Sequence, residues 1–192
     1  MMPSRGRPRN PITQTSILTA SYELLLESGF KGVTVEKIAE RAEVSKATIY
    51  KWWPNKAAVV MDGFLAAATN RLPVPDTGSV FEDVLIHATN LCRFMESQQG
   101  RIIAEIIGEG QQDKVLMEAC RSRYIHPRRS EAVMMMSRGI ERGELRKELD
   151  LAICVDLLYG PIFYRMLVTG EPLRDEFVKQ LVEAAFRGLQ PS

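Results

Sequence analysis

The stretch that decides the fold is residues 34–56, TVEKIAERAEVSKATIYKWWPNK. It opens with apolar residues at i, i+3, i+4 and i+7, the spacing of one buried stripe on a short helix. The stripe consists of Val35, Ile38, Ala39 and Ala42. Thr34 and Ser45 are good N-caps, so each is expected to start a helix. Because only Glu43 and Val44 lie between those helices, the segment predicts a helix-turn-helix.

The second helix of this pair, residues 46–52, has side chains suited to DNA. It is about 10 Å long at ~1.5 Å per residue, comparable with a major groove ~12 Å wide. Ile49 is expected to face the core, whereas Tyr50 can reach a phosphate or a thymine methyl group. An ordinary helical hairpin is the alternative, and it would not need so polar a helix. The DNA-binding residues predicted here are Ser45, Lys46, Ala47, Thr48, Tyr50 and Lys51.

Two further features are expected to hold the DNA backbone or the minor groove. Thr34 and Lys56 stand at helix starts, where N–H groups and a cation bind phosphates; capping alone is the alternative for Thr34. Ahead of the first helix, Arg5, Arg7 and Arg9 flank a Gly-Arg-Pro core. Such an arm can insert into a narrow minor groove, or it can contribute only positive charge.

The segment 34–56 resembles the signature of the TetR family of bacterial regulators. The family pattern maps onto Ala42, Val44, Ser45, Thr48, Ile49, Tyr50, Trp53 and Lys56. There are two departures: Glu43 stands where the turn often has glycine, and Trp52-Trp53 replaces the usual His/Tyr-Phe. Residues 142–146 and 157–170 resemble one carboxy-terminal subgroup of the family. The resemblance implies a small-molecule pocket among the middle helices.

The charge of the chain is unevenly distributed. Residues 1–60 hold nine Lys and Arg against five Asp and Glu, a net charge of +4. The other 132 residues hold 16 against 19, a net charge of −3. A basic amino-terminal third on a mildly acidic remainder suits a nucleic-acid-binding module attached to a domain with other duties.

Nearly every apolar pattern in the chain has a helical period, so an all-α fold is expected. Asn10 is expected to cap the first helix, which stops at Gly29, and Asp150 is expected to cap the helix that follows it. We expect a basic arm over 1–9, a helix-turn-helix domain over 10–55 and a helical ligand-binding and dimerisation domain over 56–192. Further helices are predicted at 78–98, 101–109, 112–125, 128–143, 150–168 and 173–189, with Pro127 separating two of them.

The composition favours a soluble cytoplasmic protein without cofactors. Three scattered cysteines without CxxC spacing suit a reducing compartment and not a disulfide framework. Two histidines 39 residues apart give no metal-ligand pattern. No apolar run of about 18 residues is expected, and so no membrane span. An enzyme is disfavoured because no nucleophile elbow, phosphate loop or framed carboxylate pair is present.

The last two helices are expected to form the interface of a homodimer, in which each chain contributes two helices; the alternative is that both helices are core. The expected interface residues are Leu157, Pro161, Tyr164, Leu181, Val182, Ala185 and Phe186. The expected pocket residues are Phe94, Met95, Met117, Cys120, Tyr124 and Met134, with His87 or His126 as a polar anchor. Such a methionine-rich stripe can equally be core.

Two functions remain open from the sequence. The first is a repressor that a small apolar effector releases from a palindromic operator in double-stranded DNA. The second is a DNA-binding regulator controlled by a protein partner, or one without any small ligand. Both require a dimer, because one short helix makes too few contacts for specific binding.

Overall fold

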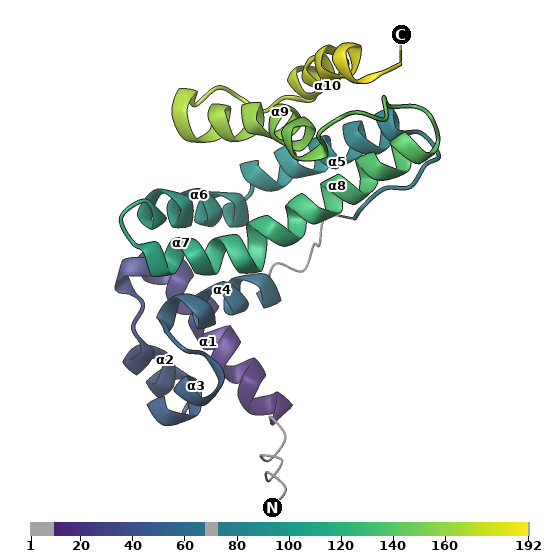
Figure 1. The fold of residues 1–192 in the computed structure, drawn as a ribbon. Helices are drawn as coiled ribbons and strands as arrows, with labels where there is room; N and C mark the ends of the chain where they lie inside the picture. Colours follow the sequence, from purple (N-terminus) through teal and green to yellow (C-terminus); the bar gives the residue numbers. More distant parts are fainter. Residues whose placement is uncertain (1–9, 68–72, 192) are drawn as a thin grey trace, which may run out of the picture. The chain divides into compact units, whose positions relative to one another are not determined.

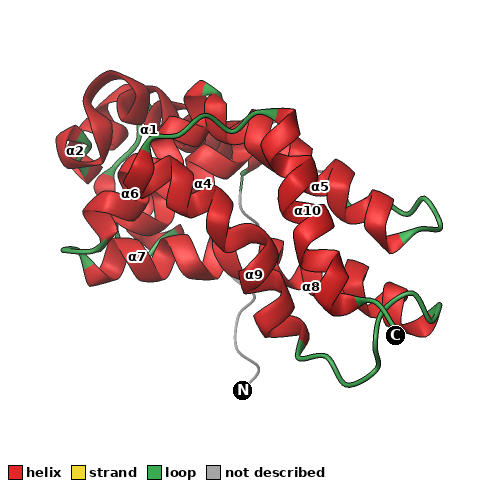
Figure 2. Cartoon of the chain, turned by 90° about the horizontal axis from the view of Figure 1, so that it is seen from above, coloured by secondary structure: helices red, strands yellow, loops and turns green. Residues whose placement is uncertain are grey.

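The computed structural model describes residues 10–67 and 73–191, and within these ranges the ordered elements are helices without strands (Figures 1 and 2). The all-α expectation is confirmed. The chain divides into two compact units. One comprises residues 1–69 and 109–123, and the other comprises residues 70–108 and 124–192.

The amino-terminal unit is built on α1 (Pro11–Gly32), α2 (Val35–Arg41), α3 (Lys46–Trp52), α4 (Lys56–Ala67) and α7 (Lys114–Cys120). Helix α1 packs along α4, and α4 contacts α7. The approach of α1 and α4 is close at Gly63, where an added Cβ would lie 2.8 Å from the backbone oxygen of Leu18. The units therefore divide differently from the expected boundary after residue 55, because α4 and α7 both pack in the unit that carries the helix-turn-helix.

The carboxy-terminal unit contains most of α6 (Gln98–Gly110) together with four long helices. These are α5 (Val80–Glu96), α8 (His126–Glu141), α9 (Leu151–Tyr164) and α10 (Asp175–Leu189). Helix α5 packs against α8 and α10, and α9 packs against the same two helices. A core of buried aliphatic, methionine and aromatic side chains fills the space between them.

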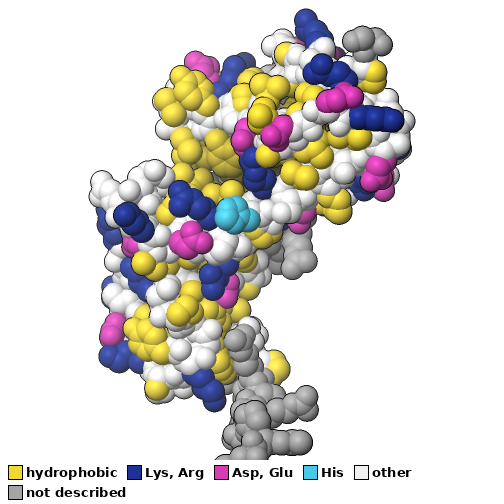
Figure 3. Space-filling model, viewed as in Figure 1, with side chains coloured by type: hydrophobic (Ala, Val, Ile, Leu, Met, Phe, Trp, Pro, Cys, Tyr) yellow, Lys and Arg dark blue, Asp and Glu magenta, His cyan; other side chains and the backbone are white. Residues whose placement is uncertain are grey.

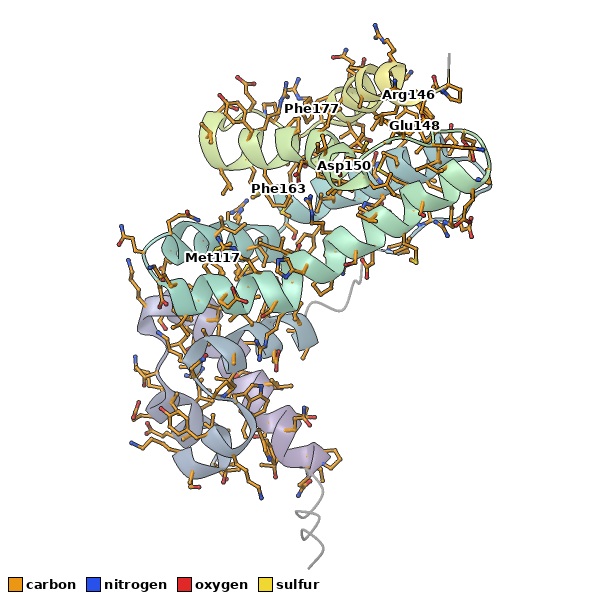
Figure 4. All side chains as sticks on the ribbon, in the orientation of Figure 1. Met117, Arg146, Glu148, Asp150, Phe163 and Phe177 are labelled. Atoms are coloured by element: carbon orange, nitrogen blue, oxygen red, sulfur yellow. The ribbon has the colours of Figure 1, made fainter. Side chains whose placement is uncertain are left out.

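The helix starts follow the sequence closely. The side chain of Asn10 accepts a hydrogen bond from the N–H of Ile12 at 3.0 Å, and Pro11 occupies the first turn. Thr34 and Ser45 cap α2 and α3 in the same way. Asp150, labelled in Figure 4, caps α9. The predicted caps are confirmed because capping depends on a few neighbouring residues.

Two helix ends differ from the expectation. Gly29 interrupts α1 with φ 64° and ψ 175°, but helical geometry resumes and continues to Gly32. Pro127 does not separate two helices. A π-helical turn, Arg121–Ile125, joins α7 directly to α8, and Pro127 lies in the first turn of α8. Proline has no N–H to donate, and the wider π turn takes up the resulting gap in the hydrogen-bond ladder.

Candidate nucleic-acid interface and ligand cavity

The turn between α2 and α3 has a defined hydrogen-bond pattern. The N–H of Val44 donates to the carbonyl of Ala39 at 2.9 Å, and the N–H of Glu43 donates to that of Glu40 at 3.1 Å. This pair of bonds is the Schellman motif, which needs a left-handed residue at its centre. Glu43 supplies that residue with φ 53°. The turn therefore keeps the expected geometry although a glutamate stands where glycine is usual.

Helix α3 separates its buried side from its exposed side as the sequence predicts. Ile49 is 1% exposed and attaches the helix to the core, whereas Tyr50 is 53% exposed. Lys46, Ala47 and Lys51 are exposed, and Thr48 is half-buried. The structure thus brings the polar side chains of α3 together on one accessible face.

Two contacts organise the start of α3. The Ser45 hydroxyl accepts from the N–H of Thr48 at 3.2 Å and lies 3.0 Å from the Thr48 hydroxyl. Lys46 Nζ lies 3.0 Å from Glu36 Oε1. The pKa of the Glu36 carboxyl is lowered, first by a bond to its own backbone N–H and then by Lys46. Because both partners are more than half exposed, this ion pair contributes little to stability, and Lys46 can exchange it for a phosphate.

The tryptophans that depart from the family pattern pack beneath α3. Trp53 is 3% exposed, and its indole N–H donates to Asp62 Oδ2 on α4 at 2.7 Å. Asp62 Oδ1 in turn accepts from Arg123 Nε at 3.0 Å. The Trp52 ring meets that of Trp53 edge-on, with 5.7 Å between centroids. The carboxylate of Asp62 therefore joins the end of α3 to the π turn through two hydrogen bonds.

The two predicted phosphate contacts at helix starts differ. The Thr34 hydroxyl accepts from the N–H of Lys37 at 3.2 Å, so it caps α2. In the absence of DNA, Lys56 Nζ donates to the carbonyl of Phe30 at 2.9 Å and lies 3.8 Å from the centroid of the Phe30 ring. Burial lowers its pKa. The predicted arm residues Arg5, Arg7 and Arg9 lie outside the described residues.

The carboxy-terminal unit contains a cavity of about 290 Å³. Its wall is formed by α5, the π turn, α8 and α9, with Ile107 of α6 and Leu167 after α9. The lining is mainly apolar and includes three aromatic rings, those of Tyr124, Tyr159 and Phe163; Phe163 is labelled on α9 in Figure 4. A concave, mainly apolar space with a few polar groups is the usual form of a small-molecule site.

The polar side chains of the lining include a buried pair, two arginines and the carboxylate of Asp156. His87 Nδ1 lies 2.8 Å from the phenol oxygen of Tyr159, and the two rings are nearly perpendicular. Burial, and to a lesser extent the charge of Arg128, lowers the pKa of His87. Burial raises the pKa of Tyr159. Both groups are therefore neutral near pH 7. The second arginine, Arg129, forms an ion pair with Asp156 across α8 and α9.

Most of the predicted pocket residues lie elsewhere. Tyr124 and His87 line the cavity, and Phe94 stacks behind Tyr124 with 6.5 Å between ring centroids. Met95 is a buried core residue outside the lining, and Met134 is 52% exposed. Met117, labelled on α7 in Figure 4, and Cys120 are buried and belong to the amino-terminal unit. A methionine at helical spacing was therefore a better indicator of the core than of the cavity lining.

The predicted interface residues fall into two groups, those of α9, which are largely exposed, and those of α10, which are largely buried. On α9, Leu157 is 50% and Tyr164 58% exposed, and Pro161 is half-buried. On α10, however, Val182, Ala185 and Phe186 belong to the core of the chain itself, and Leu181 is half-buried. The Phe186 ring packs edge-on against Phe81 of α5, with 5.1 Å between centroids. The apolar stripe of α10 is thus covered by α5, whereas that of α9 is exposed.

The exposed side of α9 is apolar apart from Asp156, which pairs with Arg129. We call the α9 stripe the set formed by Ile153, Leu157 and Tyr164 of α9 and by Val168 of the π-helical turn that follows, Arg165–Thr169. Each of the four side chains is at least half exposed. Hydrophobic side chains gather over α9 in Figure 3. Contrary to the expectation, Leu151–Thr169 is long and apolar enough to span a membrane, with 28% of the window buried. Length and composition alone are weak evidence for a span.

Residues able to hold a metal ion do not gather in the part of the chain that the structure describes. The cysteines are all buried and free. Burial raises the pKa of the Cys92 thiol to about 12 and that of Cys120 to about 11. These thiols stay protonated and unreactive at neutral pH.

Known proteins match both parts of the chain. Residues 17–61 match the family model described as bacterial regulatory proteins of the tetR family, and residues 74–185 match that of the tetracyclin repressor-like carboxy-terminal domain. The regulator YdeS of Bacillus subtilis (strain 168), an uncharacterized HTH-type transcriptional regulator, is 57% identical over 190 residues, which cover 99% of this chain and 96% of YdeS.

A solved structure and a further sequence relative agree with this relationship. The TetR family transcription regulator SCO0332 is 37% identical with a TM-score of 0.78, and the match covers 93% of this chain and 99% of SCO0332. The DNA-binding transcriptional repressor TetR of Mycobacteroides abscessus is 27% identical over 95% of this chain and 94% of its own. These relatives are transcriptional regulators. The chain therefore belongs to the TetR family, whose members are helix-turn-helix regulators that bind DNA and act as dimers.

Proposed function

We propose that this protein is a cytoplasmic repressor that binds a palindromic operator as a homodimer and leaves it when a small apolar molecule fills the cavity. One observation carries the DNA-binding part: α3 presents Lys46, Tyr50 and Lys51 on an exposed face while Ile49 fixes it to the core. The name of the Mycobacteroides abscessus relative supports repression.

In this proposal α3 lies in the major groove with its N-terminus foremost. Ala47 allows close approach of the backbone, and Thr48 and Lys46 bind base edges or phosphates. Tyr50 and Lys51 contact phosphates, and Ser45 and Thr34 present helix N-termini to phosphates. The arm residues Arg5, Arg7 and Arg9 enter the adjacent minor groove. Lys56 supports these contacts indirectly, because it holds the end of α1.

The α9 stripe is proposed as the centre of the dimer interface, with Pro161 and Leu181 at its edge. An exposed apolar stripe is a liability in a monomer but is buried when it meets its own copy across a two-fold axis. Two copies of α3 then read two half-sites about one helical turn of DNA apart, ~34 Å. A soluble dimer also accounts for the apolar length of Leu151–Thr169 without a membrane.

A route for release runs along the π turn. Tyr124 and Ile125 line the cavity, and the preceding residue, Arg123, donates to Asp62. Asp62 also accepts from Trp53 at the end of α3. Tyr124 is covalently bonded to Arg123, so a ligand that moves Tyr124 also acts on the hydrogen bonds that link Arg123 through Asp62 to Trp53. π turns often occur at functional sites. The fold neighbour FrrA, a flavonoid-responsive regulator, supports a small-molecule effector (TM-score 0.70, 21% identity).

The test is footprinting of the purified full-length protein on DNA flanking its own gene. We expect a protected palindrome whose half-sites are about one helical turn apart. The Tyr50→Ala variant should lose the footprint at the same concentration while it remains a dimer in sedimentation. Protection that is independent of sequence, or equal for both proteins, would refute the proposed role of α3.

A further inference from the structure

His87 is the polar group of the cavity with an unmet hydrogen-bonding need. The residue is 3% exposed and lines the cavity. Its Nδ1 is bonded to Tyr159, whereas its Nε2 is buried without a hydrogen-bond partner among the described residues. A buried polar atom without a partner costs about 1–3 kcal/mol, so native proteins rarely keep one without a reason.

The hydrogen-bond count assigns the tautomer of the neutral imidazole. If the Tyr159 hydroxyl donates to Nδ1, the phenol proton is satisfied and one group, the Nε2 N–H, lacks a partner. If Nδ1 instead carries the proton, both the phenol proton and the Nε2 lone pair lack partners. The first arrangement leaves fewer buried groups unsatisfied. His87, a residue of the cavity lining, therefore holds a buried hydrogen-bond donor without a partner among the described residues.

The rest of the lining restricts the shape and charge of a ligand. The volume of about 290 Å³ lies just below the ~300–1,000 Å³ range for ligand pockets. The aromatic rings of Tyr124, Tyr159 and Phe163 suit an offset-stacked planar ring system. Both arginines are already matched by carboxylates, Arg129 by Asp156 and Arg128 by Glu131. The cavity thus provides no uncompensated cation for an anionic ligand.

We infer that the effector is a compact, flat, uncharged molecule with one hydrogen-bond acceptor, such as a ring carbonyl, and that this acceptor binds the Nε2 N–H of His87. This inference rests on the effector cavity of the proposed function and adds the chemical class of the ligand. The Tyr159 hydroxyl acts through His87, because it fixes which ring nitrogen carries the proton. The aromatic walls supply affinity, and the single donor supplies orientation and selectivity.

The experiment is calorimetric titration of the full-length protein with matched probes. Each bicyclic ketone, 1-indanone and 1-tetralone, is paired with its hydrocarbon, indane and tetralin, and 1-naphthoate represents an anion. We expect each ketone to bind about ten-fold more tightly than its hydrocarbon, as one satisfied buried donor predicts. In His87→Phe the ratio should fall to about one. His126→Phe is the matched control, because His126 is exposed and outside the cavity lining.

The outcomes separate the inference from the proposed function. Equal affinity for ketone and hydrocarbon would be consistent with an apolar ligand cavity. It would overturn the inferred hydrogen bond between a ligand acceptor and His87. Tighter binding of 1-naphthoate than of the ketones would overturn the uncharged ligand in favour of recognition by arginine. Failure of all five probes to bind would overturn the ligand class, while the operator footprint would still test DNA binding independently.

A second measurement does not depend on any probe or variant. The chain has two histidines, so ¹⁵N–¹H correlation of the imidazole nitrogens resolves both. At pH 7 we expect His87 to be neutral with the proton on Nε2, and the signals of the exposed His126 serve as the internal comparison. A proton on Nδ1 of His87, or a charged His87 ring at pH 7, would overturn the inference.

Discussion

Helices α3 and α9 both present functional faces, but the faces differ in chemistry. On α3 the exposed side is polar, and Ile49 alone is deeply buried. On α9 apolar residues cover the buried side and most of the exposed side. A polar face on a short helix reveals its use through its side chains. An apolar face reveals only that something covers it, and that cover can be the core, a ligand or a second chain.

The largest expected effect distinguishes core from interface. Phe186→Glu should unfold the carboxy-terminal unit, because loss of a buried Phe costs about 3–5 kcal/mol and the buried charge adds to this. Leu157→Glu, in the α9 stripe, should leave the helix content unchanged and give monomers. Circular dichroism on heating and sedimentation velocity measure the two effects. A folded Phe186→Glu monomer would assign α10 to the interface after all.

The next effect compares two neighbours on α3. Ile49→Ala should lower the free energy of unfolding by about 2–4 kcal/mol, because it leaves a cavity in the core. Tyr50→Ala should leave stability nearly unchanged and weaken operator binding by about ten-fold or more. Urea denaturation and fluorescence anisotropy with operator DNA measure the pair. Equal loss of stability in both variants would contradict the exposed role of Tyr50.

A smaller effect tests the connection between the two regions. In the absence of ligand, Asp62→Asn should bind the operator within about two-fold of the affinity of the unsubstituted protein. The concentration of ketone probe needed to release it from the operator should rise several-fold. The reason is that the amide accepts only one of the two hydrogen bonds from Trp53 and Arg123 equally well. Glu118→Gln, on the exposed side of α7, is the control. Unchanged release by Asp62→Asn would exclude this route.

The smallest effect concerns the turn that sets the direction of α3. Glu43→Gly should raise the free energy of unfolding by about 0.5 kcal/mol, because relief of the positive φ exceeds the added entropy of the unfolded chain. Glu40→Gly, inside α2, should lower it by about 1 kcal/mol. Chemical denaturation of the three proteins measures the difference. A destabilising Glu43→Gly would show that the left-handed geometry costs the wild type little.

The sequence by itself determined the helical class, the helix-turn-helix and the separation of Ile49 from the exposed side of α3. It also located the caps at Asn10, Thr34, Ser45 and Asp150. Capping and helical periodicity depend on residues within a few positions of one another, so they can be recognised without knowledge of the fold.

Only the tertiary structure decided the rest. It placed Phe186 against Phe81, gave Lys56 to the end of α1, and brought His87 of α5 to Tyr159 of α9, which is 72 residues away. It also placed Met117 and Met134 outside the lining of the cavity. The hydrophobic effect has no direction, so an apolar side chain does not specify its neighbour. That choice is made when helices distant in sequence pack together, and the cavity and the exposed stripe are what this packing leaves.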